Sequence, residues 1–139
     1  MGLIYAEVEL INSADVVNAR RYIIGEEEVR SMRVTMLVDS GSFMMVINET
    51  IMEYLGLSIK EKGRAVQLAD GSWVEYDVVG PIDVRFADRQ ATCNAFVLPG
   101  DCEPLLGAIP MEEMDVIIHP SRQELIVHPA YPRSSAYRL

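Results

Sequence analysis

The sequence predicts a mainly β fold, and three features of the chain indicate it. Apolar and polar residues alternate over residues 4–10 with the two-residue period of a half-buried strand. An Asp-Gly pair at residues 70–71 separates two strand-like runs, which is the pattern of a β-hairpin. Turn-forming residues recur at short intervals along the rest of the chain. We therefore expect several short strands with one or two short helices.

The length of the chain indicates a single domain. Its 139 residues suit one hydrophobic core and leave no room for a second full domain. We place this domain at residues 1–130. Residues 131–139 show no periodicity, so we expect a loose C-terminal tail there.

The first third of the chain is expected to hold three strands. After the strand over residues 4–10 we expect a turn over residues 12–15. Three successive glutamates at residues 26–28 are typical of a solvated loop. Apolar residues then predict a second strand over residues 32–38 and a further run over residues 43–47.

A short helix is expected directly after the third run. Asn48 is a residue type that caps helix N-termini, Glu49 suits the first helical turn, and Gly56 suits the C-terminal stop. The expected buried stripe consists of Ile51, Met52 and Leu55.

The hairpin is the strongest signal in the second half of the chain. It is expected over residues 66–76, with a two-residue Asp70-Gly71 turn whose positive φ values match the twist of the strands. Its second arm continues past Gly80-Pro81 to residue 86. The remaining expected elements are a turn over residues 87–89, a strand over 92–98, a short helix opening at Pro110 and covering 111–114, and strands over 116–118 and 124–127 around a turn at 120–122.

Composition and charge exclude several classes of protein. A net charge of −9 argues against nucleic-acid binding, because phosphate contacts need clustered Lys and Arg. No apolar stretch approaches the roughly 18 residues that span a bilayer, so no membrane contact is expected. Cys93 and Cys102 lack a CxxC motif and a secretory signal, so we expect both to be unpaired packing residues of a cytoplasmic protein.

No cofactor or metal is expected either. The two histidines, His119 and His128, have no cysteine or carboxylate neighbours at the spacing of metal ligands. The chain also lacks a glycine-rich phosphate loop.

The segment that points most directly to chemistry begins at Asp39. This carboxylate lies at the end of an apolar run, and a hydroxyl and a glycine follow at Ser40 and Gly41. A carboxylate held at the end of a hydrophobic strand is costly outside a functional site, and a following glycine lets the backbone turn sharply. The pattern predicts that Asp39 is catalytic.

Here the chain resembles a known family. The segment Leu37-Val38-Asp39-Ser40-Gly41-Ser42 resembles the Asp-Thr/Ser-Gly-Ala/Ser signature of the retropepsin-like aspartic proteases, in particular their small single-domain bacterial and archaeal members. The helix ending at residues 54–57, the Asp70-Gly71 hairpin in the flap position, and Leu105-Leu106-Gly107 before the terminal helix are similar to that family's order of parts. The resemblance implies a small closed acid-protease-like β-barrel with a β-hairpin flap.

The chemistry of this family implies a homodimer. Peptide hydrolysis by this route needs two carboxylates that share one proton, so that one activates water while the other protonates the scissile carbonyl. Two like charges about 4 Å apart repel by roughly 4 kcal/mol at an effective dielectric near 20, so such a pair retains a proton. Since the chain carries one signature, Asp39 must meet its copy on a two-fold axis.

The resemblance also assigns roles to the surrounding residues. Ser40 would hydrogen-bond across the axis, and Gly41 would place its backbone N–H within reach of a carboxylate oxygen. The flap would close over a peptide or protein substrate. The candidate substrate-binding residues of the flap are Leu68, Ala69, Asp70, Gly71, Ser72 and Trp73. Structural support beneath the catalytic loop is assigned to Ser42, Leu105, Leu106 and Gly107.

One departure from the family pattern concerns specificity. After Ser42 the chain runs Phe43-Met44-Met45, where retroviral members often place acidic substrate-binding residues. The resemblance therefore carries no substrate preference over to this chain.

Alternatives stay open at this point. Trp73 suits a substrate pocket or ordinary strand packing equally well. A serine hydrolase built from Ser40 or Ser42 with a histidine is disfavoured, since no Gly-x-Ser-x-Gly elbow is present. The main rival is a catalytically silent dimeric β-domain that acts as a peptide-binding or assembly module, because fold does not fix function and eight methionines suit recognition.

Overall fold

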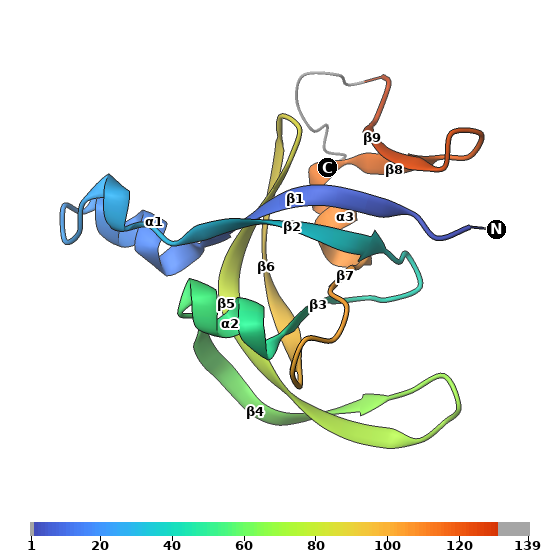
Figure 1. Cartoon of the computed structure of the whole chain (residues 1–139), viewed down its shortest axis with the longest axis horizontal. Helices are drawn as coiled ribbons and strands as arrows, with labels where there is room; N and C mark the ends of the chain where they lie inside the picture. Colours follow the sequence, from blue (N-terminus) through green and yellow to red (C-terminus); the bar gives the residue numbers. More distant parts are fainter. Residues whose placement is uncertain (1, 131–139) are drawn as a thin grey trace, which may run out of the picture.

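A computed structural model of the chain describes residues 2–130. The tail predicted over residues 131–139 lies outside the described residues. The elements, drawn in Figure 1, are β1 (Tyr5–Asn12), α1 (Ser13–Arg20), the 3₁₀ helix η1 (Glu26–Glu28), β2 (Ser31–Val38), β3 (Met45–Asn48), α2 (Glu49–Leu55), β4 (Ser58–Gln67), β5 (Trp73–Phe86), β6 (Arg89–Leu98), β7 (Leu105–Leu106), α3 (Ala108–Met114), β8 (Val116–His119) and β9 (Glu124–Val127). The fold is mainly β, which confirms the predicted class.

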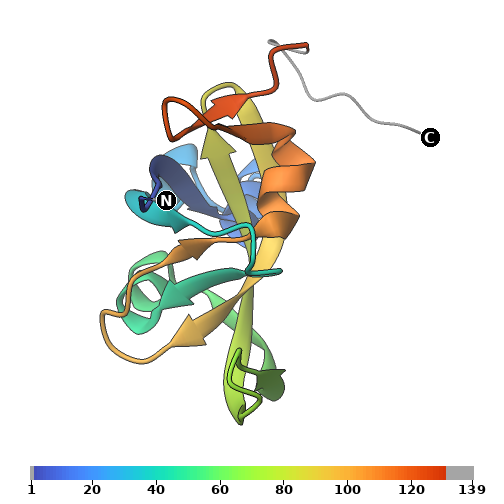
Figure 2. The same cartoon turned by 90° about the vertical axis from the view of Figure 1, so that its right-hand side faces the viewer.

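Most strands belong to one sheet that returns on itself. Seven strands pair in the order β1-β2-β7-β3-β6-β5-β4. β1 pairs with β2 and, through residues 9–12, also with β5. The first six strands of this order therefore form a ring, and β4 is attached to β5 outside it. This arrangement is compatible with the small barrel implied by the resemblance. The β4–β5 hairpin projects from one end of the molecule, and the two-stranded β8–β9 sheet lies at the other end (Figures 1 and 2).

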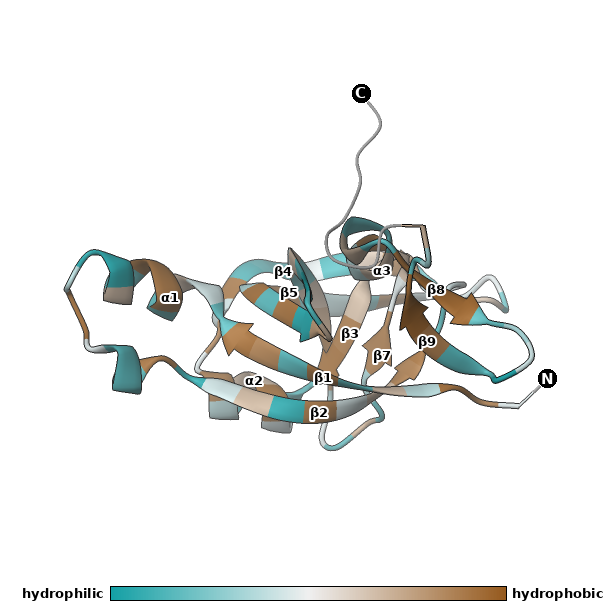
Figure 3. Cartoon of the chain, turned by 90° about the horizontal axis from the view of Figure 1, so that it is seen from above, coloured by the Kyte–Doolittle hydropathy of each residue, from teal (hydrophilic) through white to brown (hydrophobic). Residues whose placement is uncertain are grey.

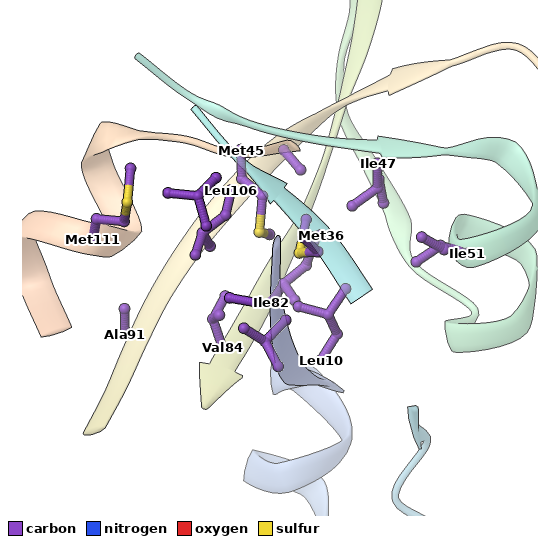
Figure 4. Packing of buried hydrophobic residues seen from close by; sticks show 14 of the residues in the cluster. Leu10, Met36, Met45, Ile47, Ile51, Ile82, Val84, Ala91, Leu106 and Met111 are labelled. Atoms are coloured by element: carbon purple, nitrogen blue, oxygen red, sulfur yellow. The ribbon is translucent and has the colours of Figure 1, made fainter. Parts of the chain in front are cut away.

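Hydrophobic side chains fill the centre of this ring (Figure 4). Leu10, Met36, Met45, Ile82 and Leu106 come from five different strands, and all are 0% exposed. Burial of one such side chain contributes about 1.5–3 kcal/mol. Figure 3 shows β7, which pairs with β2, and β3, which pairs with β7, largely in hydrophobic colours. Since two of these five residues are methionines, methionine content alone does not indicate a recognition surface in this chain.

The turn predicted over residues 12–15 is wrong, because a helix begins there. The side chain of Asn12 accepts a hydrogen bond from the backbone N–H of Asp15 at 3.1 Å and caps α1. The Asp15 carboxylate is buried and is held by the guanidinium of Arg30 at 2.8 and 2.9 Å. The sequence of this helix has no apolar stripe that would have predicted it. A polar contact between Asp15 and the distant Arg30 holds the helix in place instead. Within the described part the fold thus has a third short α-helix besides the two expected.

The helix predicted after residue 48 is confirmed. The Asn48 side chain accepts from the N–H of Ile51 at 2.9 Å, and Gly56 ends the helix with a left-handed φ of 61°. Ile51 and Leu55 are buried, and Met52 is partly buried against the same core.

The hairpin is confirmed, but its turn differs from the prediction. The Gly71 N–H donates to the Leu68 carbonyl at 2.9 Å, and the Leu68 N–H donates to the Ser72 carbonyl at 2.8 Å. Because Leu68 and Ser72 close the loop, it has three residues, 69–71, and not two. Among these three residues, Gly71 alone has a positive φ, of 87°. The first arm also begins earlier than expected, at Ser58. The sequence did not indicate this part of the strand, because its residues are exposed and show no apolar alternation.

The C-terminal elements follow the predicted order. α3 begins at Ala108, two residues before Pro110, because the N–H groups of Ala108 and Ile109 donate to the carbonyls of Ser42 and Phe43 at 2.7 and 3.0 Å. The strands predicted around the turn at residues 120–122 are present as β8 and β9.

The two cysteines are free, and only one of them packs against the core. Burial, followed by the nearby carboxylates of Glu113 and Asp83, raises the pKa of Cys93 to about 12. Cys102 is exposed in the loop before β7, so its prediction as a packing residue is wrong. Its part in the fold is a backbone one, since its carbonyl accepts a hydrogen bond from the Asn48 side chain at 2.8 Å.

Candidate active site

The loop that carries Asp39 follows the last residue of β2. β2 lies between β1 and β7 in the sheet, and the Asp39 N–H donates to the Leu106 carbonyl at 3.0 Å. On the other side, the Val38 N–H donates to the Ile4 carbonyl at 2.8 Å. Hydrogen bonds to β7 and to the segment before β1 therefore hold the backbone at the end of β2, from which the Asp39 side chain projects.

Hydrogen bonds within the loop orient the carboxylate. The Gly41 N–H donates to Asp39 Oδ1 at 3.0 Å, which is the contact that the resemblance implied. The Ser42 N–H donates to the Asp39 carbonyl at 3.1 Å, and Ser42 Oγ donates to the Met44 carbonyl at 2.8 Å. The φ of Gly41 is not in the left-handed region, so the turn does not need glycine for its backbone angle. A Cβ there would lie 3.2 Å from Asp39 Oδ1, so glycine provides space beside the carboxylate.

Gly107 lies directly against this loop. A Cβ on Gly107 would lie 2.4 Å from the Met44 carbonyl oxygen and 2.7 Å from the Ser42 carbonyl oxygen. Leu106 is fully buried next to it and accepts the Asp39 N–H. β7 and the start of α3 therefore lie against the Asp39 loop through Leu106 and Gly107, while Ser42 belongs to the loop itself.

Ser40 lies at the tip of the loop and is exposed. It makes no hydrogen bond to the side chains of residues 2–130, and Asp39 is half-buried beside it. Both side chains thus lie at the surface of one chain, where a second chain has access to them.

A groove opens on one side of the loop. It has a volume of about 590 Å³ and extends from residues 41–44 to residues 64–68 of the hairpin. Tyr76 and Phe96 line it, with ring centroids 6.4 Å apart. Leu105, expected only as support, also lines this groove. The groove therefore joins the Asp39 loop to the hairpin, and its lining is mainly apolar.

The flap residues predicted from the sequence divide into two groups. Leu68 lines the groove. The other five, Ala69, Asp70, Gly71, Ser72 and Trp73, are exposed on the hairpin and do not line the groove within one chain. Trp73 is 65% exposed, so it is no part of the core of the described chain.

The tip of the hairpin is ordered by its own side chains. Both the backbone N–H and the hydroxyl of Ser72 donate to Asp70 Oδ1, at 2.9 and 2.6 Å. These hydrogen bonds from Ser72 hold the pKa of Asp70 below its ordinary value. Asp70 therefore stabilises the turn as a carboxylate.

Several groove residues were missed from the sequence. Arg64, Val66 and Tyr76 lie on the hairpin, and Phe96 and Leu98 lie on β6. No local motif marks them, because they come together only through strand pairing. The alternation of the hairpin strands was the one signal that could have placed Val66 on the same face as Leu68.

A second hollow adjoins Asp39 on its other side. Asp39 and Ser40 line it together with Leu3, Ile4, Leu37 and Ile118, and its volume is about 340 Å³. Leu3 is 70% exposed there. The loop is thus flanked by two apolar depressions, one towards the hairpin and one towards the N-terminal strand.

Neither a metal centre nor a membrane-spanning helix is found among residues 2–130. No three His, Cys, Asp or Glu side chains converge there in a way that could hold a metal ion. None of the helices in that part is long and apolar enough to cross a bilayer.

Comparisons with known proteins agree with this geometry. Among solved structures, the retroviral protease-like domain of Ddi1 from Leishmania major is similar, with a TM-score of 0.56 and 15% identity over 93% of this chain and 90% of that chain. At this identity the likeness concerns the fold, which is retropepsin-like. No curated protein sequence matches the chain. The sequence model of the aspartyl protease family matches residues 26–118, which include the Asp39 loop, the hairpin and the Leu105–Leu106 strand, and the chain therefore belongs to that family.

Proposed function

We propose that this protein is an aspartic endopeptidase that acts as a homodimer, with one catalytic Asp39 from each chain. One carboxylate of the pair accepts a proton from water, and the other donates a proton to the carbonyl oxygen of the scissile peptide bond. The pair keeps one shared proton, because two charged carboxylates about 4 Å apart would repel each other. No metal or cofactor takes part in these steps.

The position of Asp39 is the observation that carries this proposal. Its backbone is fixed by Leu106, its Oδ1 accepts the Gly41 N–H at 3.0 Å, and the loop borders the apolar groove. A carboxylate oriented by a backbone donor beside a groove of peptide size is suited to hold a water molecule against an extended substrate.

A second chain completes the site in this proposal. Among residues 2–130 of one chain, Asp39 is the one carboxylate in the lining of the hollow beside it, and no carboxylate lines the groove beside its loop. Ser40 is exposed at the tip of the loop and is available to bond across a two-fold axis. The hairpin of each chain then covers the substrate and excludes water, which moves Ala69 to Trp73 into contact with it.

Peptide hydrolysis tests the proposal. The protein is incubated with a diverse peptide library at about pH 4 to 6, where an aspartic dyad holds one proton, and the products are identified by mass spectrometry. We expect cleavage that a statine-type transition-state mimic blocks. Asp39→Ala is expected to lower the rate by about a hundred- to ten-thousandfold, since it removes both acid and base groups.

Asp39→Asn separates catalysis from assembly. Its dimer is expected to persist in sedimentation equilibrium, because like-charge repulsion at the axis disappears, whereas turnover is expected to be lost. A monomeric Asp39→Asn protein would argue against the proposed axis. If the native protein and Asp39→Ala are equally inert and both remain folded dimers, the peptide-binding or assembly module is the better description.

A further inference from the structure

The groove beside the Asp39 loop carries one formal charge. Of its lining residues between 2 and 130, Arg64 alone bears a charge at neutral pH. This is unexpected in a chain with a net charge of −9. A neighbouring hollow that shares Tyr76 and Leu98 with the groove differs, since Glu49, Glu75 and Asp77 line it. The lining of the groove therefore holds one basic side chain and no acidic one, although the Arg64 guanidinium pairs with Glu61 beside it.

Strand geometry places Arg64 at a defined distance from the flap tip. Residues two apart on a strand point to the same face, so Arg64, Val66 and Leu68 share one face of β4 and its extension. Arg64 pairs with Tyr76 on β5, whose ring belongs to the groove. At about 3.3 Å per residue, Arg64 lies about 13 Å from Leu68, which is the span of four residues in an extended peptide.

The guanidinium of Arg64 is available for a ligand. Its ion pair with Glu61 has an N–O distance of 3.3 Å, and the two side chains are 55% and 51% exposed. Such exposed pairs contribute little to stability, so a carboxylate from a ligand can replace Glu61 at low cost. A guanidinium also presents a planar fork that suits a carboxylate.

We propose that Arg64 is a specificity-determining residue that selects peptides with an Asp or Glu side chain within about four residues of the apolar side chain in the groove. The apolar residue packs beside Phe43, Met44 and Leu68, and the acidic side chain binds the Arg64 guanidinium. This inference rests on the proposed function only in taking the ligand to be an extended peptide.

The cleavage profile of the full chain provides the first test. With the native protein, Asp and Glu are expected to be enriched about two- to fivefold within four residues of the cut bonds, as a solvent-exposed ion pair allows. Arg64→Gln should remove the enrichment, and Arg64→Glu should replace it with enrichment of Lys and Arg. Arg33→Gln is the matched control, because Arg33 forms a similarly exposed pair with Glu7 at 2.9 Å and does not line the groove.

A binding measurement makes the test independent of turnover. Fluorescence anisotropy follows labelled peptides that hold an apolar centre and Glu, Gln or Lys four residues to either side, added to the full-length Asp39→Asn protein. In one of the two placements, the Glu peptide is expected to bind about two- to fivefold more tightly than the Gln peptide. The difference should disappear in the Asp39→Asn, Arg64→Gln double variant and shrink at high salt.

The outcomes separate the inference from the proposed function. Equal affinity for Glu and Gln peptides, no measurable binding, or a preference that survives Arg64→Gln overturns the role of Arg64. Cleavage without acidic enrichment overturns this role and leaves the protease intact. A preference in binding without any cleavage by the native protein supports the role of Arg64 and argues against catalysis.

Discussion

Two glycines at the site serve clearance and not backbone freedom. Neither Gly41 nor Gly107 has a positive φ, yet a Cβ on either would crowd atoms of the Asp39 loop. The Gly107 position is the tighter one, because the atoms in the way are backbone carbonyls of Ser42 and Met44 that cannot rotate aside. The precise placement of Asp39 therefore depends on a residue that has no side chain.

Gly107→Ala is expected to be destabilising. The new methyl group would force the loop away from β7, at a cost of about 1–3 kcal/mol for overpacking, and peptide turnover should fall with it. Urea unfolding measures the first effect and a peptide assay the second. Gly100→Asn is the control, since nothing lies within 4 Å of a Cβ there and Asn tolerates its left-handed φ of 61°. Equal stability of Gly107→Ala and the native protein would mean that the loop is not held by this contact.

At the scale of elements, polar contacts connect the two helices that flank the start of the sheet. Arg30 binds the carboxylate of Asp15 in α1, and its guanidinium also lies where a Cβ on Gly56 would be, at the end of α2. Asn12 contributes from the other side, because its Nδ2 donates to the Leu55 carbonyl at 2.8 Å. The C-terminus of α2 is thus hydrogen-bonded to Asn12 of β1, and Arg30 from the segment before β2 lies against it.

The Asp15–Arg30 pair predicts a pH-dependent part of the stability. Hydrogen bonds from Arg30 lower the pKa of Asp15 from its ordinary value of 3.8 in the folded protein. A lowered carboxyl pKa contributes stability that is present above 3.8 and is lost as the pH falls through the folded value. Asp15→Asn should therefore cost about 2 kcal/mol near pH 7, allowing for the half-exposed Arg30, and progressively less as the pH falls below 3.8.

Urea unfolding of both proteins between about pH 3 and pH 7 measures this difference. Glu7→Gln provides the comparison, because the Glu7–Arg33 pair is exposed on both sides and is expected to contribute less than about 1 kcal/mol. A gap between native and Asp15→Asn that stays constant over the pH range would exclude a titrating contribution from this carboxylate.

At the scale of the whole molecule, the net charge of −9 opposes the proposed self-association. Two copies carry twice this charge, and the hollow at Leu3 and Ile118 that flanks Asp39 is apolar. In the proposed dimer, hydrophobic contact near the Asp39 loop favours association, while the overall charge weakens it.

Acidification is therefore expected to strengthen the proposed dimer. The net negative charge of the protein decreases as the pH falls from about 7.5 to 5, so the dissociation constant should fall several-fold at low salt. Sedimentation equilibrium at both pH values measures the change. In about 0.5 M salt the change should be much smaller, because screening removes long-range repulsion. A dimer that weakens on acidification would show that charge attraction, and not repulsion, governs the assembly.

Local signals in the sequence determined much of this protein. The alternation of residues 4–10, the Asn48 and Gly56 caps, the hairpin around Gly71 and the Asp39 motif each depend on a few neighbouring residues. Such features reflect backbone preferences and short-range hydrogen bonds, so the amino-acid sequence alone is sufficient to predict them. All four are present in the structure, and the chain belongs to the family that the Asp39 motif indicated.

Tertiary structure alone decided the features that depend on distant residues. Asn12 caps α1 locally, but the contact between Asp15 and Arg30 joins this helix to a distant segment. Gly107 is required by carbonyl groups of the Asp39 loop. The groove forms only when the hairpin and β6 pair, which brings Arg64 and Phe96 to one surface. The physical reason is the same in each case: the free energy of these contacts belongs to pairs of atoms that the fold brings together, and no short stretch of sequence contains both partners.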